Sequence, residues 1–155
     1  MKLLRKHTLS STGAYIAVLM GILSPVIILG IVGCGDGEKS LTHTGKLVSL
    51  IMEHRNVVEH SGEGGPQISM LVTRGRVKGA IPEDGVKVNY SVNDGPFQSL
   101  VMRKTASGRR FIATLPEQEK GAKIRYYIEV NHRTGKKLTF PGEAQAGNYF
   151  TINIK

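Results

Sequence analysis

The sequence predicts an all-β fold, an antiparallel sandwich, preceded by one N-terminal apolar helix. Three observations predict it: an apolar run over residues 14–34, apolar side chains that alternate with polar ones over most of residues 68–154, and turn-forming residues between the alternating stretches. No helical pattern of about 10–15 residues interrupts the alternation, which excludes a parallel α/β sheet. With 155 residues, the chain has room for one domain of ordinary size and an appendage.

The apolar run at residues 14–34 has the length of a transmembrane helix. As a helix it would extend about 31 Å, close to the roughly 30 Å hydrocarbon core of a bilayer. The basic segment before it, residues 1–13, contains Lys2, Arg5 and Lys6, whereas the first acidic residue is Asp36. The positive-inside rule therefore predicts a cytoplasmic N-terminus in an inner membrane, with the rest of the chain on the periplasmic, extracytoplasmic side.

Two kinds of anchor fit this run. Ile31-Val32-Gly33-Cys34 resembles the lipobox of bacterial lipoproteins, which implies cleavage before Cys34 and lipid attachment to that cysteine. The run is longer than the roughly 7–15 apolar residues of a cleavable signal core, which favours an uncleaved signal anchor. Both alternatives stay open, and both tether the following domain to membrane lipid.

The segment between the anchor and the alternating region has two parts. Residues 35–46 are polar and rich in glycine, as expected of a linker. Residues 47–64 fit a helix and an extra strand equally well. Because this second part is apolar and lies outside the regular pattern, it is the first candidate for contact with a protein partner, through Leu47, Ile51 and Val58; packing on the sandwich is the alternative.

Seven short strands are predicted from residue 68 onward. The alternation places them at residues 68–73, 86–93, 97–101, 110–115, 124–130, 138–140 and 150–154. Asp94-Gly95 supplies a residue pair favoured in a tight hairpin turn, after which the returning strand carries Phe97, Ser99 and Val101. Seven strands separated by turns are typical of a sandwich of about 90–100 residues.

Two of these stretches resemble a known family. Residues 88–98 (VNYSVNDGPFQ) are similar to a hairpin of bacterial immunoglobulin-like/fibronectin-III-like domains, and residues 121–130 (GAKIRYYIEV) are similar to one of their strands. The resemblance implies an immunoglobulin-like sandwich over residues 65–155, with Tyr126 or Tyr127 as a corner tyrosine bonded to nearby backbone. The chain has no Trp and one Cys, so the core Trp and disulfide of antibody domains are absent. Such sandwiches serve many functions, so the resemblance implies a fold and little more.

No residue pattern points to catalysis, a cofactor or a metal. The exported histidines, His43, His54, His60 and His132, lie in no recognisable nucleophile motif. His54 and His60 would point about 240° apart on a helix and lie about 20 Å apart on a strand, so they could share a metal only across a turn. The single Cys34 excludes an internal disulfide, a Cys-rich zinc module and covalent c-type haem. The sequence therefore predicts a protein that is not an enzyme and carries no cofactor.

The charge and the aromatic residues limit the choice of partner. The net charge is +9, and Arg74, Arg76 and Lys78 alternate on one predicted strand face, where they could dock a polyanion or merely protect a sheet edge. Export makes nucleic acid an unsuitable partner. Only Tyr127 and Tyr149 fall clearly on the outward phase of their segments, which gives little surface for stacking a neutral sugar.

The sequence thus predicts a non-enzymatic, membrane-tethered immunoglobulin-like domain that acts as an accessory or assembly subunit of a larger membrane or envelope complex. The anchor would raise the local concentration of the domain, and a sheet face or edge would recognise an integral-membrane partner. The alternative is a binding module for acidic cell-envelope glycans through the basic strand face of Arg74, Arg76 and Lys78.

Overall fold

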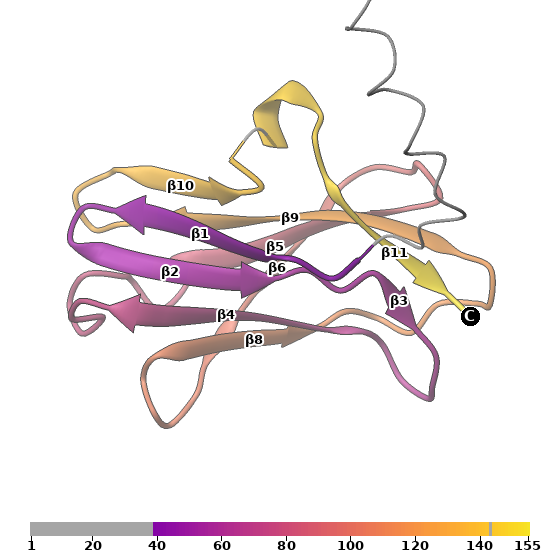
Figure 1. Ribbon diagram of the computed structural model, residues 1–155, viewed down its shortest axis with the longest axis horizontal. Coiled ribbons are helices and arrows are strands. Elements are labelled where there is room, and N and C mark those ends of the chain that lie inside the picture. The colour runs from indigo at the N-terminus through magenta and orange to yellow at the C-terminus, as the bar shows by residue number, and fades with distance from the viewer. Residues whose placement is uncertain (1–38, 143) are drawn as a thin grey trace, which may run out of the picture. The chain divides into compact units, whose positions relative to one another are not determined.

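Two β-sheets pack face to face in the computed structural model, which describes residues 39–142 and 144–155 (Figure 1). The first sheet has the order β1 (Thr42–Leu47), β2 (Leu50–Arg55), β4 (Gln67–Arg74), β8 (Arg110–Thr114) and β7 (Arg103–Lys104). The second has the order β3 (Glu59–His60), β11 (Phe150–Ile154), β9 (Lys123–Asn131), β5 (Val86–Val92) and β6 (Gln98–Val101). Strand β10 (Lys137–Phe140) also pairs with β9, and a short 3₁₀ helix, η2 (Ala144–Ala146), precedes β11.

This architecture confirms the predicted all-β fold with two sheets. Each of the seven strands predicted by alternation is present, as β4, β5, β6, β8, β9, β10 and β11. The pairing departs from a purely antiparallel sandwich at β3, which runs parallel to β11. Among residues 39–142 and 144–155, no helix is long and apolar enough to cross a bilayer. The predicted anchor at residues 14–34, with Cys34, lies outside the described residues.

The sandwich begins at Thr42 rather than at residue 65. Part of the predicted linker forms β1, and the ambiguous segment at residues 47–64 forms β2 and β3. Strand β1 looked like a linker because it contains Gly45, and the packing explains that glycine: a Cβ atom there would lie 2.8 Å from Cζ of Phe140. The glycine makes room for an aromatic ring of the opposite sheet, so its function here is packing and not flexibility.

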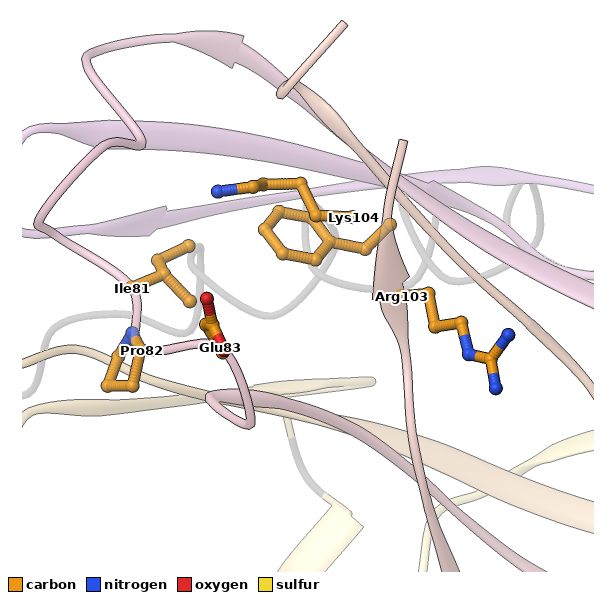
Figure 2. A pocket seen from close by; sticks show the side chains of 6 residues that line it. Ile81, Pro82, Glu83, Arg103 and Lys104 are labelled. Atoms are coloured by element: carbon orange, nitrogen blue, oxygen red, sulfur yellow. The ribbon is translucent and has the colours of Figure 1, made fainter. Parts of the chain in front are cut away.

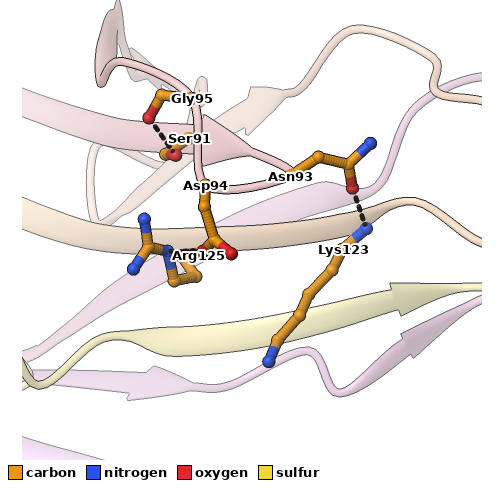
Figure 3. Close-up of polar contacts among 6 residues, drawn as sticks. All are labelled: Ser91, Asn93, Asp94, Gly95, Lys123 and Arg125. Carbon is orange, nitrogen blue, oxygen red and sulfur yellow. Dashed lines mark hydrogen bonds and ion pairs between the residues drawn. The ribbon is translucent and has the colours of Figure 1, made fainter.

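The hairpin between β5 and β6 differs by one residue from the predicted turn. The residues with positive φ are Asn93 (48°) and Asp94 (62°), and Gly95 N–H donates to the carbonyl of Val92 at 2.9 Å. Asn93 Oδ1 accepts a hydrogen bond of 2.9 Å from the backbone N–H of Lys123, which ties the turn to β9 (Figure 3). A two-residue turn at Asp94-Gly95 would have paired Phe97 with Val92.

The observed register pairs Tyr90 with Gln98 instead, and this shift decides which face β6 presents. A slip of one residue turns every side chain of a strand to the other side. Phe97 and Val101 consequently point outward and are 39% and 42% exposed. After Val101 the chain passes to the other sheet. The crossing takes one residue, the fully buried Met102, and the next residue, Arg103, pairs with Ile112 of β8.

A buried polar contact joins the two sheets in the centre of the core. His54 of β2 is 0% exposed, and its Nδ1 lies 2.8 Å from the carbonyl of Ser69. Its Nε2 lies 3.0 Å from the hydroxyl of Tyr126 on β9, and Val57 N–H donates to that hydroxyl at 3.1 Å. Since the Ser69 carbonyl only accepts, Nδ1 carries the proton, Nε2 accepts from Tyr126, and the neutral imidazole satisfies every partner.

Tyr126, and not Tyr127, therefore has the buried hydroxyl bonded to backbone that the family resemblance implied. Its backbone partner, Val57, is distant in sequence rather than nearby. Burial lowers the pKa of His54 from 6.5 to about 4, with a smaller contribution from His43, and outweighs the opposing effect of the Ser69 hydrogen bond. The same desolvation raises the pKa of the Tyr126 hydroxyl.

The stability of the domain is expected to fall in acid because of His54. The unfolded chain binds a proton near pH 6.5 and the folded chain near pH 4, so protons favour unfolding between those values. The contribution is complete above pH 6.5 and is lost as the pH falls toward about 4, with a total on the order of 3 kcal/mol. Denaturant midpoints of the full-length chain in detergent, measured at pH 7, 5.5 and 4.5, check this. His54→Gln should flatten the profile, and equal slopes for both proteins would contradict the assignment.

Removal of the Tyr126 hydroxyl tests the contact between the sheets. Tyr126→Phe keeps the ring but leaves His54 Nε2 and the Val57 N–H without their protein partner. The expected loss is about 1–3 kcal/mol of unfolding free energy, the usual cost of unpaired buried polar groups. Tyr90→Phe is the matched control, because its hydroxyl bonds the exposed Gln98 side chain at 2.9 Å and its loss should cost less.

Candidate functional site

The outer face of the second sheet carries a cluster of aromatic rings. The ladder between β5 and β9 pairs Asn89 with Tyr127 and Ser91 with Arg125, on the side away from the core. Tyr149 comes just before β11, whose first residue, Phe150, pairs with the buried Tyr126. Since neighbouring strand residues face opposite sides, Tyr127 and Tyr149 both point outward.

Phe97 completes this cluster from the β5–β6 hairpin. Its ring centroid lies 4.9 Å from that of Tyr149 and 5.5 Å from that of Tyr127, and the two tyrosine rings are 5.9 Å apart with an angle of 32° between their planes. We call Phe97, Tyr127 and Tyr149 the aromatic patch. These spacings are those of favourable aromatic pairs, so the rings hold one another in place.

Arg125 lies beside the aromatic patch and is fixed from two sides. Its guanidinium carbon lies 5.6 Å from the ring centroid of Tyr149 and 5.9 Å from that of Phe97, within cation–π range. Its Nε lies 3.1 Å from Oδ1 of Asp94, in an ion pair whose angle does not satisfy a hydrogen bond (Figure 3). The hairpin turn therefore supplies both Phe97 and the carboxylate that orients Arg125.

A shallow depression of about 210 Å³ opens beside the rings. Its described lining consists of Phe97, Tyr127, Glu129, Thr139, Ala144 and Tyr149. Glu129 Oε1 accepts a hydrogen bond of 2.9 Å from Asn131 and lies 3.6 Å from Nζ of Lys137. Partial desolvation, followed by the nearby Glu129 and Tyr149, raises the pKa of the Tyr127 hydroxyl, which stays a neutral donor at physiological pH.

This arrangement combines an apolar floor with polar groups at its edge. Exposed rings can pack against the apolar face of a ligand, while Glu129, Thr139 and the Tyr127 hydroxyl can exchange hydrogen bonds with its polar groups. A concave site that joins apolar side chains to a few placed polar groups is typical of small-ligand recognition. The rings lie on a rigid sheet, so little conformational entropy is lost on binding.

The basic residues singled out in the sequence do not share one strand face. Arg74 ends β4, whereas Arg76 and Lys78 lie in the following loop. The structure brings Arg76 and Lys78 to an open hollow that is also lined by Ser107 and Arg109, from the turn before β8, whereas Arg74 is not among its lining residues. The cations therefore gather between two loops at one end of the sandwich, which corrects the expected strand face.

The apolar residues proposed for partner contact pack inside the domain. Leu47 is 3% exposed and Val58 is 8% exposed, while Ile51 is partly buried. Leu47 belongs to the main core, which explains the apolar character of this stretch. In the folded domain Leu47 and Val58 are not available to a partner.

The four histidines in the described part of the chain each contact neighbouring side chains or backbone groups. His43 packs edge-on against Phe150 with ring centroids 4.7 Å apart, and His54 belongs to the buried contact with Tyr126. His60 Nε2 lies 3.0 Å from the carbonyl of Gly64, and His132 Nδ1 lies 2.7 Å from Oγ1 of Thr134. In the part of the chain that the structure describes, no group of three or more His, Cys, Asp or Glu side chains is placed to hold a metal ion.

A second depression, of about 300 Å³, lies where the β4–β5 loop approaches β7. Ile81, Pro82 and Glu83 of the loop face Lys104 across it (Figure 2). Its floor includes Phe111, a core residue that is 1% exposed. The depression thus lies at the edge of the hydrophobic core. Glu83 and Lys104, which carry charges of opposite sign, are among the residues that line it.

Comparison with known proteins finds a distant structural likeness. No protein-family model matches the chain, and no curated protein matches it in sequence. One similar solved structure is described as "Crystal structure of Br derivative BhCBM56"; it has 13% sequence identity and a TM-score of 0.39, over 70% of this chain and 95% of that chain. A likeness this weak carries no argument about function, so the site is interpreted from its own residues.

Sequence reasoning found part of the aromatic patch. It identified Tyr127 and Tyr149 as outward-facing, but it missed Phe97 and Arg125. Arg125 was visible in the alternation of β9, two residues before Tyr127. Phe97 could not be placed without the register of the hairpin, because the shift of one residue decides its face.

Proposed function

We propose that this domain is a non-enzymatic glycan-binding module and that the aromatic patch, with Arg125 and Glu129, is its sugar-binding surface. The observation that carries the proposal is three mutually packed rings left partly exposed on the outer face of the second sheet, with Phe97 39% exposed. Rings that could have been buried in the core instead form an apolar surface toward solvent, which marks an interaction site.

Sugar recognition needs both components that this surface offers. The faces of a pyranose ring present C–H groups, which pack against aromatic rings, while its edge presents hydroxyl groups. Glu129 accepts hydrogen bonds and Arg125 donates them, so both kinds of hydroxyl contact are available beside the rings. Asp94 keeps the guanidinium in place before a ligand arrives, which lowers the entropic cost of binding.

Binding without cleavage is supported by the partners of the polar groups. Glu129 accepts a hydrogen bond from Asn131 and lies 3.6 Å from Nζ of Lys137, so it already has two partners within the domain. His54, the buried imidazole, donates and accepts hydrogen bonds within the core and does not reach the aromatic patch. The predicted anchor at residues 14–34 would hold such a module at the extracytoplasmic face of a membrane.

A protein partner is the second candidate for the same surface. Tyrosine and arginine are enriched among the residues that dominate protein–protein binding energy, and Arg125 packed on Tyr149 has that composition. In this reading the domain is the accessory subunit of a membrane or envelope complex, attached through the aromatic patch. The shallow depression with its polar edge favours the glycan.

The glycan proposal is tested with Tyr127→Ala and Tyr149→Ala in the full-length chain. Each protein, purified in a detergent without a sugar headgroup, is applied to immobilised neutral and acidic oligosaccharides, and the best ligand is then titrated calorimetrically. Loss of a stacking ring should weaken binding about tenfold, whereas Tyr127→Phe should retain most of it.

Val101→Ala is the matched control, because Val101 is 42% exposed on β6 but lies outside the aromatic patch. It should leave the affinity unchanged. Absence of binding to any saccharide, together with co-purification of an integral membrane protein that Tyr149→Ala abolishes, would replace the glycan with a protein partner.

A further inference from the structure

A second surface, remote in sequence from the aromatic patch, is built from cations. It is an open hollow of about 490 Å³ lined by Gly75, Arg76, Val77, Lys78, Ser107, Gly108 and Arg109. The first four belong to the β4–β5 loop and the others to the turn before β8. We call it the basic hollow.

The charge of the basic hollow is uncompensated within the described part of the chain. Arg76, Lys78 and Arg109 line it without an acidic residue among its described lining. The ion pairs that the structure shows for residues 39–142 and 144–155 involve Arg125, Lys137 and Lys155 instead. Like charges held together at a surface repel one another, so a concentration of three cations favours an anionic ligand.

The backbone on either side of the basic hollow is firmly placed. Gly75 has a φ of 99°, and a Cβ atom there would lie 2.6 Å from the carbonyl oxygen of Ser49. The loop is therefore seated against the turn between β1 and β2 and needs glycine at its bend. On the other side, the carbonyl of Arg109 accepts a 2.8 Å hydrogen bond from Val72 N–H, and Arg109 Nη1 lies 3.5 Å from the carbonyl of Thr73.

The location of the basic hollow leaves it accessible. It lies at the end of the sandwich where β4 ends and β8 begins (Figure 1). Strand β1 also ends there, and it starts at the opposite end. The six residues of β1 span about 20 Å, so Thr42 is well removed from the cations. A long ligand can thus contact this end without meeting the point at which the chain enters the domain.

We propose that the basic hollow binds the anionic groups of an acidic glycan chain. Arg76 and Arg109 offer planar donor pairs to a carboxylate or phosphate, and Lys78 offers a mobile ammonium. That the anionic groups belong to a glycan rests on the proposed function, whereas the inference that the basic hollow binds anions does not. The two chemical sources are phosphate groups and uronate carboxylates.

The test titrates the full-length chain, in a nonionic detergent without a sugar headgroup, with a phosphate-bearing polysaccharide and with oligouronates at low and moderate salt. Arg76→Gln/Lys78→Gln should weaken binding at low salt at least about tenfold and reduce its salt dependence, since each contact contributes on the order of a severalfold change. Arg109→Gln should weaken it severalfold. The polymer that binds more tightly identifies the source of the anion.

Lys120→Gln/Lys123→Gln is the matched control, because it removes the same charge from two exposed lysines outside the basic hollow. It should change the affinity less than twofold, and thermal unfolding should be unchanged in all variants. If both double variants weakened polyanion binding equally, the effect would come from net charge alone, and the proposed site would be overturned. Binding of a DNA duplex as tight as that of the acidic glycans would overturn it as well. Tyr127→Ala separates the two proposals. If it abolishes neutral-sugar binding but not polyanion binding, both sites are supported. If the unmodified protein binds only one of the two ligands, only the site for the other ligand is overturned.

Discussion

The contact between His54 and Tyr126 is the constraint on which the rest of this sandwich depends. It connects the first sheet to the second through a neutral imidazole whose two nitrogens are both engaged. Phe150 packs beside both rings, with centroids 5.0 Å from His54 and 5.2 Å from Tyr126. In a domain without Trp and without a disulfide in its sandwich, this group of rings fixes the separation and the register of the sheets.

The same residues determine where the outer aromatic surface lies. Tyr126 and Phe150 face the core, and their sequence neighbours Tyr127 and Tyr149 face solvent. Because β11 pairs Phe150 with Tyr126, fixing the inner rings also brings the outer rings together. The aromatic patch is therefore a consequence of the core, and a change that loosened the inner pair would also spread the outer one.

Sequence alternation was sufficient to predict most strands of the second sheet, since their long central members are buried on one side. It failed for β1, because an edge strand tolerates polar residues and because Gly45 serves to admit the ring of Phe140. It also misplaced Phe97, since the turn at Asn93–Asp94 moves the register by one residue. Sequence alternation could not predict the basic hollow, because Arg76 and Arg109 lie in separate loops that come together only at one end of the first sheet.

The passage of the chain through Met102 has a consequence for self-association. Strands β6 and β7, at the two sheet edges on that side, have four and two residues and are consecutive parts of one backbone separated by a single buried residue. A neighbouring molecule that tried to add a strand there would find few free amide and carbonyl groups in line before the chain turned away. Such short, interrupted sheet edges resist edge-to-edge aggregation.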